Sequence, residues 1–152
     1  MTDTVSPAKR SEVMSKVGSK DTKPELLIRK GLHSLGFRYR LHVKELPGKP
    51  DLVFPRFKSV IQINGCFWHG HSCPLCRMPS SNSEYWRRKV ARNKERDMSN
   101  RQSLVKEGWR VLTIWECALR GKEKLELNRV LELTSEWLLS KRSVCEIKGS
   151  AS

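Results

Sequence analysis

Residues 65–76 bring together side chains that could bind a metal ion. The stretch contains three of the five cysteines and two of the four histidines of the chain, Cys66, Cys73, Cys76, His69 and His71. Thiolate sulfur and imidazole nitrogen are the usual ligands of tetrahedral zinc sites in proteins. Two large aromatic residues, Phe67 and Trp68, lie among these candidate ligands, so a bound ion would hold their rings in a fixed pose. We therefore expect a zinc site that presents aromatic side chains.

The sequence offers more candidate ligands than a four-coordinate zinc ion needs. Cys117, which follows an apolar segment further along the chain, is a sixth candidate. The spacing Cys73-x-x-Cys76 is typical of zinc knuckles, whereas Cys117 would tie the loop to the core. The residues alone leave the choice between Cys76 and Cys117 open. A histidine outside the zinc shell, close to a carboxylate that binds Mg²⁺, would suit a general base.

Asp51 is the candidate ligand for such a second, harder ion. It follows a Pro-Gly-x-Pro turn and begins a short apolar segment, so we expect its carboxylate at the edge of a sheet. Mg²⁺ is usually held by one or two carboxylates, with water and substrate phosphate as the other ligands. Pro50 and Asp51 resemble the Pro-Asp pair of the PD-(D/E)xK nuclease core, but the triplet 62–64, Gln-Ile-Asn, lacks the acid and the lysine of that core. An aspartate with only a turn role is the alternative.

The pattern of apolar residues predicts the elements that must position these side chains. Thr22, Pro24 and Glu25 form a capping-box helix start, and Gly36 ends that helix. Alternating and short apolar segments predict strands, and a long cationic segment predicts a helix. The expected elements are a helix over 22–36, strands over 37–43, 51–54 and 59–64, a helix over 83–106, a strand over 109–115 and a helix over 122–139. We expect an α/β sandwich with a mixed sheet whose first three strands form an antiparallel meander.

Composition points to a polyanionic partner. The 152 residues carry 30 Lys and Arg against 16 Asp and Glu, a net charge of +14, which favours nucleic acid over an anionic membrane surface. No apolar run is long enough to span a bilayer, and the first ten residues have no secretory signal. We expect a cytoplasmic monomer with reduced thiols. We divide it into an N-terminal DNA-contacting arm over 1–20, one domain over 21–140 and a flexible tail over 141–152 that contains Cys145.

Five segments together resemble the very-short-patch-repair (Vsr) mismatch endonucleases: 20–25, 46–51, 65–73, 108–111 and 115–119. That family uses Mg²⁺ to nick one DNA strand on the 5′ side of the T in T·G mismatches, which arise when 5-methylcytosine deaminates. Its fold is a variant of the PD-(D/E)xK core with a structural zinc. The resemblance implies the same fold, substrate and ions here, in a bacterial cytoplasm, with functional links to mismatch-repair proteins and a cognate cytosine-5 methyltransferase.

The resemblance also implies a role for each matching residue. Asp51 and the main-chain carbonyl of Ile63 would bind Mg²⁺, His69 would be the general base, and Glu25 would orient water or another ligand. The zinc ligands would be Cys66, His71, Cys73 and Cys117. Phe67, Trp68 and Trp86 would form a wedge beside the mismatch. Met14 on the N-terminal arm would reach the minor groove, and Lys89 and Asn93 would face the mismatch.

Two departures from the family pattern concern chemistry. Asn64 stands where the family has a catalytic histidine, and an amide can hydrogen-bond a water molecule but cannot transfer a proton. Catalysis would then depend more heavily on His69. Cys76 adds a thiol that could compete for zinc. Two other functions remain alternatives: a non-catalytic, zinc-stabilised DNA-binding module, and a restriction-type nuclease without mismatch preference.

Overall fold

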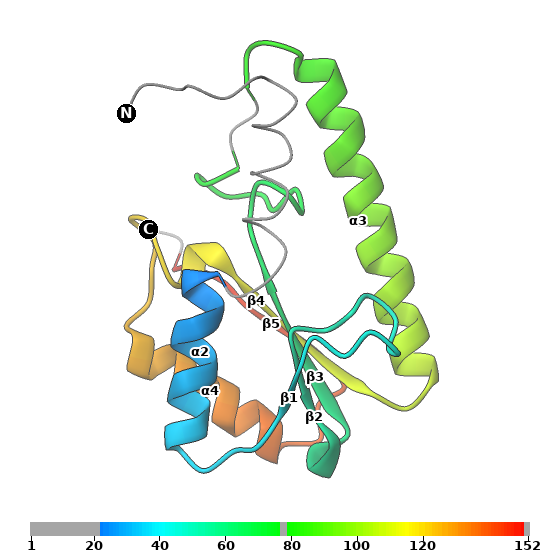
Figure 1. Cartoon of the computed structure of the whole chain (residues 1–152). Coiled ribbons are helices and arrows are strands. Elements are labelled where there is room, and N and C mark those ends of the chain that lie inside the picture. Colours follow the sequence, from blue (N-terminus) through cyan, green and yellow to red (C-terminus); the bar gives the residue numbers. More distant parts are fainter. Residues whose placement is uncertain (1–21, 77–78, 151–152) are drawn as a thin grey trace.

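The chain forms a five-stranded mixed sheet with helices on both faces (Figure 1). The computed structural model describes residues 22–76 and 79–150, so the N-terminal arm and Met14 lie outside the described residues. Among the described helices, none is both long and apolar enough to cross a bilayer.

The sheet has the strand order β1-β2-β3-β4-β5. Its strands are β1 (Arg40–Leu41), β2 (Leu52–Phe54), β3 (Ser59–Asn64), β4 (Arg110–Trp115) and β5 (Val144–Ile147). β1, β2 and β3 pair antiparallel, whereas β3, β4 and β5 pair parallel. The predicted meander and the mixed sheet are therefore confirmed. Short 3-10 turns, Pro55–Phe57 and Glu116–Ala118, follow β2 and β4.

Helices α2 (Lys23–Ser34) and α4 (Leu127–Leu139) cover one face of the sheet, and α3 (Ser83–Lys106) lies on the other (Figure 1). The α2 and α4 face holds the larger apolar core, in which Ile28, Val130 and Trp137 pack against strand residues such as Phe54 and Ile114. Thr22 caps α2, because its Oγ1 accepts a hydrogen bond from the N–H of Glu25. This cap fixes the first turn of α2, and hence Glu25, near the sheet edge.

Helix α3 is anchored at few points. Of its 24 residues, only Val90 and Leu104 are buried. Leu104 packs against Val53, Val60 and Val111 of the sheet. Most of α3 is therefore held by polar contacts and carries its charged side chains into solvent. Its bounds agree with the prediction.

Three sequence predictions need correction. The expected strand over 37–43 contains only β1, because His42 adopts a left-handed backbone with φ of 48°. The expected helix over 122–139 begins only at Leu127. The expected flexible tail contains β5, which pairs with β4 and buries Ile147. This strand is stabilised by its neighbour in the sheet, so its own sequence gives little sign of it.

Candidate active site and metal centre

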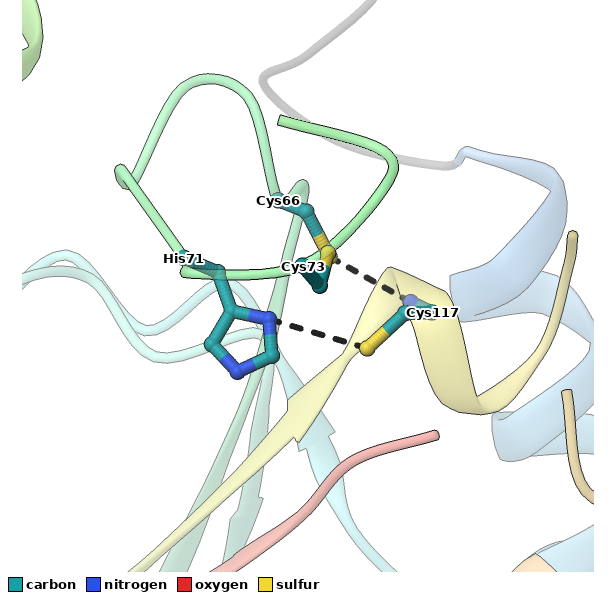
Figure 2. A group of neighbouring side chains, drawn as sticks. All are labelled: Cys66, His71, Cys73 and Cys117. Atoms are coloured by element: carbon teal, nitrogen blue, oxygen red, sulfur yellow. Dashed lines mark hydrogen bonds between the residues drawn. The ribbon is translucent and has the colours of Figure 1, made fainter. Parts of the chain in front are cut away.

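Four potential zinc ligands converge beside the end of β4. Cys66, His71 and Cys73 come from the loop after β3, and Cys117 comes from the 3-10 turn after β4 (Figure 2). One ligand atom from each lies within 4.8 Å of the others. Among the described cysteines, Cys76 is not part of this group. The loop and the core thus meet at these four side chains.

Hydrogen bonds and ring stacking hold the side chains of this centre in place. The N–H groups of Cys117 and Gly149 donate hydrogen bonds to the sulfurs of Cys66 and Cys117, at 3.3 and 3.2 Å. Trp115 stacks on His71 with ring centroids 4.1 Å apart, which fixes the plane of the imidazole. Burial raises the pKa of both Cys66 and Cys117, because the desolvated thiolate lacks a counter-charge.

Three sulfurs and one imidazole within this separation fit a tetrahedral zinc ion. A cation would supply the charge that the desolvated thiolates lack, and it would bind Cys117 to Cys66, 51 residues apart in the chain. The donor set also argues against Mg²⁺, which prefers oxygen ligands.

A second cluster, which we call the carboxylate cluster, consists of Glu25, His42 and Asp51. Nε2 of His42 lies 3.1 Å from Oε2 of Glu25, and Nδ1 lies 3.8 Å from Oδ1 of Asp51. Arg29 approaches the same Glu25 oxygen at 3.0 Å. The main-chain N–H of Ile63 donates a 2.7 Å hydrogen bond to Oδ2 of Asp51. These contacts join α2, the β1–β2 connection and the end of β3.

The pKa of the Asp51 carboxyl is well above its ordinary value. Burial raises the pKa of its carboxyl to about 7, the hydrogen bond from Ile63 opposes this rise, and the negative charge of Glu25 adds to it. A divalent cation would favour the ionised form. One imidazole and two carboxylates whose ligand atoms lie within 4.8 Å of one another fit such an ion.

A third group, the His69–Asp97 pair, joins the loop after β3 to α3. Nδ1 of His69 is 2.5 Å from Oδ2 of Asp97 on α3. Both residues line a small polar pocket together with Gln62, Asn64, Asn100, Arg101 and Thr113. Ile63 contacts Asp51, and the following residue, Asn64, lines this pocket. The end of β3 therefore connects the two groups.

The aromatic residues form one cluster between the zinc loop and α3. The rings of Phe67, Trp68 and Trp86 meet edge to face, with centroids 5.2 to 5.8 Å apart. Nζ of Lys89 lies 5.3 Å from the Trp68 ring and 5.6 Å from the Trp86 ring. The side-chain amide of Asn93 donates a 2.9 Å hydrogen bond to the carbonyl of Trp68. Lys89 and Asn93 thus hold the aromatic loop on α3.

The structure brings together most of the side chains that the sequence singles out, and it adds two that sequence reasoning missed. His42 lies opposite Asp51, because the register pairs Leu41 with Leu52. The antiparallel meander was the signal that could have found it. Asp97 lies seven residues from each of the two buried residues of α3, Val90 and Leu104, and so shares their face. An acid on the inward face of a cationic helix was the signal there.

Comparison with known proteins gives one consistent result. Residues 2–75 match the family described as DNA mismatch endonuclease Vsr. The chain is 38% identical to the DNA mismatch endonuclease Vsr of Escherichia coli over 147 residues, which cover 97% of this chain and 94% of the relative. It is 47% identical to the type II nicking enzyme V.XorIIP of Xanthomonas oryzae pv. oryzae, over 83% of this chain and 93% of the relative. It is also 47% identical to the type II nicking enzyme V.NmeAIP of Neisseria meningitidis, over 86% of this chain and 95% of the relative.

Proposed function

Since the chain belongs to the Vsr family of DNA mismatch endonucleases, we propose that it nicks one strand of duplex DNA 5′ to the T of a T·G mismatch left by deamination of 5-methylcytosine. It acts as a monomer in the bacterial cytoplasm, and its sheet is a PD-(D/E)xK core. One observation carries the mechanism: the carboxylate cluster and the His69–Asp97 pair adjoin at consecutive residues of β3, Ile63 and Asn64.

Asp51 and the main-chain carbonyl of Ile63 hold Mg²⁺ in this proposal. When bound there, the ion would supply positive charge beside the scissile phosphate and would lower the pKa of the attacking water. The Ile63 N–H keeps one oxygen of Asp51 in place, so its carboxylate has a defined orientation toward the ion. Glu25, which is almost fully buried, orients the neighbouring groups through Arg29 and His42.

His69 is the general base. The Asp97 carboxylate lies at Nδ1 of His69 and favours the tautomer with the proton on Nδ1. The lone pair of Nε2 can then accept a proton from water. Asn64 lines the same pocket and is a hydrogen-bonding partner for that water. The amide of Asn64 cannot accept the proton itself, so proton transfer rests on His69.

The aromatic cluster recognises the mismatch. Phe67, Trp68 and Trp86 enter the base stack beside the mismatch, where a wobble pair offers the least resistance to unstacking. Zinc held by Cys66, His71, Cys73 and Cys117 fixes the loop that carries two of these rings. A loop fixed beforehand loses little entropy on binding. The charge of +14, with Lys89 beside the rings, supplies the attraction to phosphate.

A nicking assay tests this function. Duplexes that carry one T·G pair in several flanking contexts, labelled on the T strand, are incubated with the zinc-loaded protein and Mg²⁺. We expect a single nick 5′ to the T and no cleavage of T·A controls of the same sequence. Equal cleavage of both duplexes would support a restriction-type nuclease. Binding without cleavage in every context would support a non-catalytic DNA-binding module.

A further inference from the structure

We propose that His42 is a direct ligand of the divalent cation at Asp51, through Nδ1, with Glu25 holding its ring. This gives the catalytic cation site an imidazole nitrogen besides its oxygen ligands. The inference rests on the proposed function only in placing the ion at Asp51. Its consequence is a site that binds Mn²⁺ and Co²⁺ more tightly than Mg²⁺, because nitrogen ligands favour transition metals.

The contacts of the two ring nitrogens support this assignment. Nε2 of His42 lies 3.1 Å from a carboxylate oxygen of Glu25, which is almost fully buried. An acidic oxygen this close stabilises a proton on Nε2, and the neutral ring then carries its lone pair on Nδ1. Metal-binding histidines in proteins usually have such an arrangement, with the other ring nitrogen directed at a carboxylate.

The distance between Nδ1 and Asp51 agrees with a shared cation. Nδ1 lies 3.8 Å from Oδ1 of Asp51, which is too long for a hydrogen bond. Once Asp51 is ionised, two electron-rich atoms at this separation repel each other unless a positive charge lies between them. Two ligands bonded to one ion at about 2.1 Å each can be separated by this distance.

The backbone holds His42 at this place. Its φ of 48° is a left-handed conformation that few residues other than glycine adopt. The main-chain N–H of His42 donates a 3.1 Å hydrogen bond to the carbonyl of Asp51, so the two candidate ligands are tied together before any ion binds. A non-glycine residue kept in an uncommon conformation beside a reactive carboxylate is typical of a functional position.

Pulsed electron paramagnetic resonance with Mn²⁺ tests the assignment on the full-length, zinc-loaded protein. A directly bound imidazole gives a nitrogen hyperfine coupling on Mn²⁺. We expect this coupling in the wild type and its loss in His42→Asn, with Mn²⁺ affinity about tenfold lower. Asparagine tolerates the left-handed backbone, so this variant keeps the fold. The matched control is His33→Gln, on the exposed side of α2, which should keep both the coupling and the affinity.

The outcomes separate this inference from the proposed function. Absence of nitrogen coupling in the wild type, or its loss in His69→Gln with retention in His42→Asn, would overturn the inference even if T·G duplexes are nicked. Loss of coupling only in His42→Asn would support it even if no duplex is nicked. As a second measurement, the ratio of Mn²⁺ to Mg²⁺ affinity should fall in His42→Asn, and an unchanged ratio would overturn the inference.

Discussion

The zinc centre and the carboxylate cluster differ in their ligand atoms and in the burial of the residues that anchor them. In the zinc centre, Cys66 is fully buried and Cys117 is 3% exposed, His71 and Cys73 are half-buried, and two main-chain N–H groups donate to the sulfurs. In the carboxylate cluster, the side chains of His42 and Asp51 are 18% and 13% exposed. A structural ion is enclosed by protein ligands, whereas a catalytic ion keeps a position open for water and substrate. In the proposed function the zinc centre would hold the aromatic loop, and the carboxylate cluster would hold the catalytic ion.

The two sites also differ in the origin of their ligands. Three zinc ligands come from one short loop, and only Cys117 comes from elsewhere. The carboxylate cluster takes Glu25 from α2, and His42 and Asp51 from the two ends of the β1–β2 connection. Variants of the two sites should therefore change different properties: stability and metal content at the zinc centre, rate at the carboxylate cluster.

The largest effect should come from Asp51→Ala. Loss of the carboxylate proposed to hold the ion would remove several kcal/mol of transition-state stabilisation, so we expect the nicking rate to fall about 1000-fold or more. Zinc content and T·G duplex binding should stay close to wild type. The control is Glu45→Ala, an exposed acid in the same connection. Single-turnover nicking and gel-shift titration measure the two properties, and retained nicking would remove Asp51 from the mechanism.

Cys117→Ser should mainly affect stability. The substitution removes the ligand that joins the loop to the core, so we expect loss of bound zinc and at least about 3 kcal/mol of unfolding free energy. Cys76→Ser is the matched control, because Cys76 is not in the four-residue group among the described cysteines, and it should keep zinc. Metal analysis and urea denaturation measure both variants. The reverse result would exchange the roles of the two cysteines.

The unfolding free energy should depend on pH differently in the wild type and in Asp51→Asn, by about 2 kcal/mol. The folded protein keeps a proton on Asp51 up to about pH 7, whereas the unfolded carboxyl loses it near pH 4. Between these values the folded state binds more protons, so stability falls as pH rises. Without Mg²⁺, we expect the unfolding free energy of the wild type relative to Asp51→Asn to fall by about 2 kcal/mol from pH 5 to pH 8. A difference that is flat with pH would show that Asp51 is already ionised when buried.

The smallest effect should come from Asp97→Asn. An amide at this position can still contact Nδ1 of His69 but no longer stabilises its charge, so we expect about a tenfold lower nicking rate with unchanged duplex binding. Glu95→Gln, on the exposed side of α3, is the control and should leave the rate unchanged. Equal rates for wild type and Asp97→Asn would mean that His69 needs no partner on α3.

Local patterns predicted much of the molecule correctly. The bounds of α3 and β3 follow from charge and apolar periodicity, and the zinc loop is visible as a density of cysteine and histidine. Such features are encoded within a few neighbouring residues, which share one element and one period. Residue types also indicate which ion each site suits, since sulfur and oxygen ligands select different metals.

Tertiary structure alone decided which distant residues meet. Cys117 joins Cys66 only because β3 and β4 are adjacent and parallel, and His42 faces Asp51 only through the register of β1 and β2. Asp97 reaches His69 because Leu104 fixes the rotation of α3 on the sheet. β5 exists because β4 offers an open edge. The sequence by itself determined the candidate ligands and most elements, whereas strand register and helix rotation, which depend on packing over the whole core, determined which of those candidates meet.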